Sequence, residues 1–153
     1  MNISVIQKHM TDIEIIKPMW EKLNSIHLEK SVYFKNKYEN FTFDKRIKSI
    51  YKKAQNGVIK LDVLLDNDTR GYVGYCLSSI EDTLGEIESI FIEEQYRKFG
   101  LGDQLMNNAL KWFKYNRIEN IEINVVYANE EVLPFYERCG FHVGNYILKN
   151  NYI

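Results

Sequence analysis

One stretch of the chain, residues 87–103, constrains the fold more than any other. It begins with the apolar run 87–92, which suits a buried strand, and passes through a short polar loop to Gly100 and Gly102. A helical pattern follows at once, with one apolar face formed by Leu101, Leu105, Ala109, Trp112 and Phe113. Glycine lets a backbone approach an anion closely, and the free N–H groups and dipole of a helix start attract negative charge. This stretch therefore predicts a pocket for a phosphate-bearing ligand.

Length and charge narrow the class of protein. The chain has 153 residues, which is the size of one ordinary domain, and 45% of them are hydrophobic, so a full core can form. The formal net charge of −1 gives no overall attraction to nucleic acid or to an anionic membrane. The N-terminus has no apolar signal segment, no window is long enough to span a bilayer, and there are only two cysteines. We expect a soluble cytoplasmic protein with reduced thiols.

The N-terminal third reads as a strand followed by helices. Residues 2–6 suit a short strand, and Thr11 or Asp12 can cap a helix whose apolar positions are Ile13, Ile16, Trp20, Leu23 and Ile26. Residues 31–43 are aromatic without a clear period, which predicts a loop or broken helix. A second helix is expected over 44–55, with Ile47, Ile50 and Tyr51 facing inward. His27 has two interpretations, a residue that lines a binding site or a packing histidine, and the second is favoured.

The rest of the chain reads mainly as strands. Strand patterns cover 58–65, 71–80 and 84–92, and the short links between them favour antiparallel pairing. Strands are also expected at 120–127 and 143–148, with a short helix over 129–139. The strand–helix–strand unit across residues 84–127 predicts a parallel, right-handed crossover. The result is an α/β (α+β) fold, in which a single mixed sheet carries helices on both faces.

Three signatures stand in one order along the second half. The first is Arg97-x-x-Gly100-x-Gly102 after a strand, and the second is Asn129 after the next strand. The third is the run Phe135-Tyr136-Glu137-Arg138-Cys139-Gly140-Phe141. Together they resemble the GNAT superfamily of acetyl-CoA-dependent N-acetyltransferases. The first motif is neither a P-loop, because no Gly-Lys-Ser/Thr follows, nor the dinucleotide fingerprint, which has a third glycine.

The resemblance implies a fold and a coenzyme site. The sheet would be mostly antiparallel, with six to seven strands and a central parallel pair that splays apart. The pantetheine arm of coenzyme A would lie in that splay beside the backbone of Ile90, Phe91 and Ile92, where an N–H would polarise the thioester carbonyl. Asn129 would bind the same arm or cap the next helix. The pyrophosphate would rest on the loop made of Arg97, Lys98, Phe99, Gly100, Leu101, Gly102 and Asp103.

Acid–base groups follow from the same resemblance and from simple chemistry. Transfer of an acetyl group to an amine expels a thiolate, and Tyr136 can protonate it as a general acid because a phenol has a pKa near 10. Glu88 and Glu86 are candidates for the base, with a water chain or a merely solvated strand as alternatives. Being two apart on a strand, they are expected to share a face with Ile90 and Ile92. Residues 71–96 contain six acidic and no basic side chains, which would attract a cationic amine or simply form a solvated edge.

The prediction is thus an enzyme that moves an acetyl group from acetyl-CoA to a primary amine of a small molecule or peptide by direct attack in a ternary complex. No metal is expected. Residues 1–57 would shape the acceptor site and 58–153 the coenzyme core, and a homodimer is a further expectation. The alternative is a non-catalytic acyl-CoA-binding or sensing module. A nucleic-acid partner is disfavoured, since the basic residues of helix 44–55 alternate with apolar ones as on a solvated helix.

Overall fold

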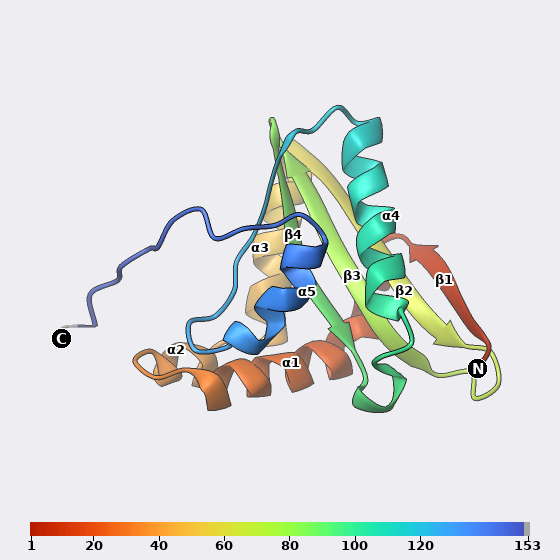
Figure 1. Ribbon diagram of the computed structural model, residues 1–153, viewed down its shortest axis with the longest axis horizontal. Helices are drawn as coiled ribbons and strands as arrows, with labels where there is room; N and C mark the ends of the chain where they lie inside the picture. The colour runs from red at the N-terminus through yellow and green to blue at the C-terminus, as the bar shows by residue number, and fades with distance from the viewer. Residues whose placement is uncertain (152–153) are drawn as a thin grey trace.

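A five-stranded sheet organises the protein in the computed structural model, which describes residues 1–151 (Figure 1). Its strands follow one another in space in chain order, and only the last pair is parallel. They are β1 (Ile3–Lys8), β2 (Gly57–Asp66), β3 (Tyr72–Glu81), β4 (Leu84–Ile92) and β5 (Asn120–Ile123). The predicted mixed, mostly antiparallel sheet is confirmed.

Helices cover both faces of the sheet (Figure 1). One face carries η1 (Met10–Ile16), α1 (Lys17–Lys30) and α3 (Phe43–Asn56), with the short α2 (Lys35–Glu39) packed on α1. The other face carries α4 (Leu101–Tyr115). The remaining short helices are η2 (Glu94–Tyr96), η3 (Glu130–Val132) and α5 (Leu133–Arg138). No helix within residues 1–151 is both long and apolar enough to cross a bilayer.

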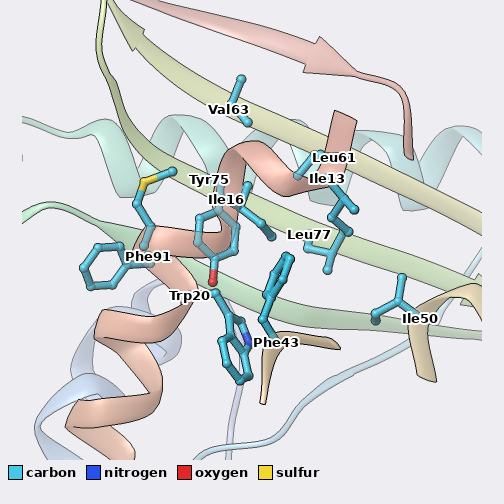
Figure 2. Close-up of a cluster of buried hydrophobic side chains, with 11 residues drawn as sticks. Ile13, Ile16, Trp20, Phe43, Ile50, Leu61, Val63, Tyr75, Leu77 and Phe91 are labelled. Atoms are coloured by element: carbon cyan, nitrogen blue, oxygen red, sulfur yellow. The ribbon is translucent and has the colours of Figure 1, made fainter. Parts of the chain in front are cut away.

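Two apolar cores hold these layers together. The first lies between the sheet and α1 and α3, and Figure 2 shows Trp20 and Phe43 within it. The Trp20 ring centroid lies 5.6 Å from those of Phe41 and Phe43. Tyr75 is fully buried in this core and its hydroxyl lies 2.6 Å from the Ser89 Oγ. The second core lies under α4, whose residues Leu101, Leu105, Ala109 and Phe113 are buried as their spacing predicts.

The expected six to seven strands are wrong, because residues 1–151 contain five. Residues 143–148 alternate like a strand, but they are exposed and pair with no strand in the described part of the chain, and Leu148 is 93% exposed. The strand expected over 120–127 ends at Ile123. The parallel pair therefore lies at one edge of the described sheet rather than at its centre. An alternating pattern forms a strand only when a neighbouring backbone accepts its hydrogen bonds.

The second helix differs from its prediction in one inward residue. Ile50 is fully buried and Ile47 packs against the first core, but Tyr51 is 45% exposed. One residue along a helix turns a side chain by about 100°, so the residue after Ile50 faces away from the sheet. Residues 31–43 contain the short helix α2, in agreement with a broken helix.

Candidate active site

The parallel strands β4 and β5 separate halfway along β4. They pair only from Leu84 opposite Asn120 to Ile87 opposite Ile123. Beyond this point β4 continues to Ile92 alongside β3, whereas the chain after Ile123 leaves the sheet. The expected divergence is thus present, and one edge of β4 has no strand beside it after Ile87 in the described residues.

A β-bulge at Glu88 lies where the strands separate. Leu77 of β3 stands opposite Ser89 and Ser78 stands opposite Ile87, so Glu88 is the extra residue. A bulge turns two successive side chains toward the same face. Glu88 bonds to α3, and Ser89 bonds to Tyr75 of the first core. The expectation that the two glutamates share a face with Ile90 and Ile92 is therefore wrong, since these isoleucines pack in the second core.

The Glu88 carboxylate is fully buried and has three donors. Arg46 Nη2 donates to it at 2.9 Å, Ser79 Oγ donates at 2.5 Å, and Lys53 forms an ion pair with it. The same Arg46 Nη2 also donates to the Glu88 carbonyl oxygen at 2.9 Å. Burial opposes ionisation, but the hydrogen bonds and the cations together outweigh it, and the pKa of Glu88 is lowered.

Glu86 also pairs with Lys53, but its pKa is shifted in the opposite direction from that of Glu88. Lys53 Nζ lies 3.1 Å from its carboxylate, and Asn124 Nδ2 donates at 3.4 Å. Burial and the neighbouring charge of Glu88 raise the pKa of Glu86 in spite of the lysine. The two carboxyls are thus driven apart in acidity, which is a common arrangement at functional sites.

Sequence reasoning missed the partners of these glutamates. Arg46 and Lys53 were read as solvated charges, yet their side chains are only 19% and 27% exposed. They lie four before and three after the buried Ile50, which places all three on one helix face. That spacing is the signal that could have found them. The expected acidic surface is neutralised only in part. Glu86 and Glu88 pair with Lys53, and Glu93 pairs with Lys22 at 2.8 Å, while Glu81, Asp82 and Glu94 are exposed.

A pocket of about 150 Å³ opens between α1, α2 and the separated strands. Its outer walls include Trp20, Leu23 and His27 of α1 and Tyr38 and Phe41 near α2. Its inner end is formed by the bulge and its surroundings, namely Arg46, Glu88, Ser89, Asn124 and Val126. His27, favoured from the sequence as a packing residue, therefore lines a pocket. The pocket joins the N-terminal helices to the point where β4 and β5 diverge.

The glycine loop lies at the start of α4. Gly100 has φ of +78° and Lys98 has φ of +69°, so this backbone is left-handed at two points. No side chain caps the helix, which leaves the first N–H groups of α4 as free donors. A Cβ built at Gly100 would meet nothing within 4 Å, so the loop is open, whereas one at Gly102 would touch the Phe135 ring at 3.2 Å. The space beside Gly100 is thus open, which we call the glycine cup, while Gly102 lets α5 pack.

Two charged side chains of the loop already interact with other groups of the protein. The Arg97 Nε donates to the Ile92 carbonyl at 2.7 Å, and its guanidinium lies over the Phe91 ring at 5.3 Å. Asp103 pairs with Arg138 at 3.1 Å. Lys98 and Phe99 are exposed, and Leu101, the first residue of α4, is buried. The backbone, more than these side chains, offers donors at the loop.

Tyr136 packs in the second core on the α4 side of the sheet, whereas Asn129 lies between Tyr127, which stacks on Tyr33, and Glu131, which pairs with Lys30 of α1. Burial, with nearby cysteine thiols, raises the pKa of Tyr136 to about 12, and its hydroxyl has no hydrogen-bond partner within residues 1–151. Asn129 is 6% exposed, its side chain does not cap η3, and its Oδ1 has no partner in the described residues. A protonated phenol and an unsatisfied carbonyl oxygen are therefore available to a ligand.

Comparison with known proteins identifies the family of this chain. Residues 20–141 match the sequence profile of the Acetyltransferase (GNAT) family. An uncharacterised N-acetyltransferase of Methanocaldococcus jannaschii is 29% identical over 117 residues, which cover 74% of this chain and 49% of that protein. The chain thus spans about half the length of this curated relative.

Two solved structures share the fold. The PaiA N-acetyltransferase of Thermoplasma acidophilum, solved in complex with coenzyme A, superposes with a TM-score of 0.75 at 18% identity, over 96% of this chain and 94% of that one. A GCN5-related N-acetyltransferase of Ralstonia eutropha gives 0.76 at 15% identity, over 97% and 98% of the two chains.

Proposed function

Because the chain belongs to the Acetyltransferase (GNAT) family, we propose that it transfers an acetyl group from acetyl-CoA to a primary amine of a small molecule or peptide. Both substrates would be bound together, and the amine would attack directly. The observation that carries the proposal is the opening between β4 and β5 after Ile87. It has an uncapped helix start and Tyr136 on one face, and a pocket and two glutamates on the other.

The residues present fit coenzyme A. The glycine cup and the free N–H groups of α4 would hold the pyrophosphate, assisted by the exposed Lys98. The unsatisfied Oδ1 of Asn129 would accept a hydrogen bond from the pantetheine arm, which carries amide N–H groups. The unpaired edge of β4 would pair with the same arm near Ile90, Phe91 and Ile92, although Arg97 already occupies the Ile92 carbonyl. Bound acetyl-CoA would supply the activated thioester.

Tyr136 is the proposed general acid. Its raised pKa keeps the phenol protonated at neutral pH, so it can donate a proton to a leaving thiolate. Its hydroxyl is free of competing bonds among the described residues. A backbone N–H of β4 beyond the bulge would stabilise the negative charge that develops on the acetyl oxygen.

Glu86 is the better proton acceptor of the two glutamates. Its pKa is raised, so it holds a proton more readily than Glu88, whose carboxylate is fully buried and bound by three donors. Glu86 bonds to Asn124, which lines the pocket, so a water beside Asn124 would carry the proton from the amine. Glu88 would then hold the bulge and Arg46 in place.

A transfer assay tests the function directly. Purified protein is incubated with acetyl-CoA and a panel of amines, and thiol release is followed together with the mass of the product. We expect thiol release that depends on both the enzyme and an amine. Coenzyme binding measured by calorimetry without release on any amine would favour the sensing module instead.

The two parts of the chain would have separate tasks. The pocket walls come mostly from residues 20–46, in accord with an acceptor site built by residues 1–57, whereas the glycine loop and α5 belong to the coenzyme core over 58–153. A homodimer stays a prediction, which light scattering would test.

A further inference from the structure

We propose that the acceptor is a monoamine whose body is a compact apolar or aromatic group, and that this body fills the pocket between α1, α2 and the separated strands. The inference rests on the proposed function and adds the chemical class of the substrate. Three features of the pocket carry it: its size and walls, the state of its charges at the inner end, and the charge at its outer end.

The pocket has the size and walls for one small ring. Its volume of about 150 Å³ matches that of an apolar protein cavity known to take up benzene. Trp20, Leu23 and Phe41 form its apolar walls together with Val126 at the inner end. A ring or branched alkyl group would gain roughly 25 cal/mol per Å² of apolar surface removed from water there. A polyamine would place its further ammonium groups against these apolar walls, out of water and without a paired charge.

The inner end has no free carboxylate for a second ammonium group. Glu88 is the one acidic residue among the described lining residues, and its carboxylate already accepts hydrogen bonds from Arg46, Lys53 and Ser79. Arg46 and Glu88 cancel in charge at this end. A monoamine can place its single nitrogen near the strand opening, where it reacts. The second ammonium group of a diamine would have to lie farther along the pocket, where the described lining has no acidic residue.

The outer end is positive. Lys37 Nζ lies 5.4 Å from the ring centroid of Tyr38, which lines the pocket. After burial, the charge of Lys37 helps to lower the pKa of the His27 imidazole, and Lys149 lies near Lys37. His27 is therefore a neutral hydrogen-bonding wall at neutral pH, and the cations beyond it repel a second ammonium group. The acceptor class follows from charge as well as from shape.

The first test is a comparison of amines with the wild-type enzyme. We expect kcat/KM for 2-phenylethylamine and for 3-methylbutylamine to exceed that for putrescine and spermidine by at least tenfold. Equal or higher values for the polyamines, with efficient transfer, would overturn the inference and leave the proposed function standing.

A charge placed in the pocket should reverse this preference. Val126 lies in the irregular segment after β5 and lines the pocket, so Val126→Asp adds a carboxylate without disturbing a helix or strand. We expect the ratio of kcat/KM for putrescine to that for 2-phenylethylamine to rise at least tenfold in Val126→Asp, and to stay within about threefold in the uncharged isostere Val126→Asn. Because both kcat/KM values are measured on the same preparation of a variant, a loss of folded protein does not change their ratio. An unchanged ratio in Val126→Asp would show that Val126 does not face the acceptor and overturn the inference.

A binding measurement tests the pocket assignment independently of the transfer reaction. Trp20 lines the pocket and Trp112 is the other tryptophan, so Trp112→Phe leaves Trp20 as the sole indole reporter. We expect 2-phenylethylamine to change its fluorescence at lower concentration than putrescine, with or without coenzyme A. If no amine is acetylated but this order holds, the proposed function fails and the pocket assignment stands; the reverse order of binding overturns the pocket assignment.

Discussion

The two sides of the strand opening are built by different means. On the α4 side the proposed ligand-binding groups are backbone N–H donors of a helix start, left free by an uncapped Gly100. On the α3 side they are buried side chains, in which Glu88 is held by three donors. A site made from backbone depends on local conformation, whereas a site made from paired charges depends on elements far apart in the chain.

The largest effect on activity is expected at Tyr136, on the backbone-built side. Tyr136→Phe removes the phenolic proton and should lower kcat by about 10²–10³-fold, within the range for loss of a general acid. Calorimetry should show a coenzyme Kd within about twofold of wild type. Tyr115→Phe, whose ring is 88% exposed at the end of α4, is the matched control and should keep full turnover. Wild-type turnover in Tyr136→Phe would exclude this residue as the acid.

Next in size is the loss of the Arg46 side chain on the charge-built side. Arg46→Met removes one of the three donors to the Glu88 carboxylate and the side-chain donor to the Glu88 carbonyl, and breaking a buried pair costs about 3 kcal/mol even at the low end of the usual range. Denaturant unfolding measures it. Lys48→Met, an exposed cation on the same helix, should change the free energy of unfolding by less than about 0.5 kcal/mol. Equal effects of the two variants would contradict the buried network.

The two glutamates should respond to pH with opposite signs. The folded pKa of Glu88 is lowered, so its ionised form adds stability above the unfolded pKa of about 4.3, and this is lost as pH falls through the folded value. The folded pKa of Glu86 is raised, so its ionisation costs stability as pH rises from about 4.3 to the folded value.

Stability measured between pH 3 and 7 in matched glutamine variants checks these signs. Glu88→Gln should lower stability at neutral pH but reduce its loss in acid, and Glu86→Gln should remove part of the cost at neutral pH. The rate of Glu86→Gln should also lose the acidic limb of its pH profile if Glu86 accepts the proton. The same pH response in both variants would mean that their environments are not distinct.

The smallest effect is expected at the glycine cup. Gly100→Ala forces a side chain into left-handed backbone at a cost of about 1–2 kcal/mol and places a methyl group in the open cup. We expect coenzyme Kd to rise by about three- to tenfold with kcat near wild type once the coenzyme saturates. Gly144→Ala, where a Cβ also meets nothing within 4 Å, serves as control. Unchanged binding in Gly100→Ala would place the phosphates elsewhere.

The sequence prediction was successful on the α4 side because it depends there on local rules. The strand over 84–92 and the helix that starts beside Gly100 lie where the pattern placed them, because glycine conformation and helix periodicity act over a few residues. The same rules failed for residues 143–148, which alternate like a strand but have no partner in the described chain. They also failed for Tyr51, where the helix face was placed one residue too far.

By itself, the sequence determined the strand over 84–92, the glycine-led start of α4 and the motifs that resemble the family, since these depend on neighbouring residues. Tertiary structure alone decided that Glu88 is the extra residue of a bulge and that its carboxylate meets Arg46 and Lys53. The physical reason is that a bulge shifts the alternation of a strand by one residue. Its position depends on the register with β3 and on the packing of α3, which no short stretch of sequence contains.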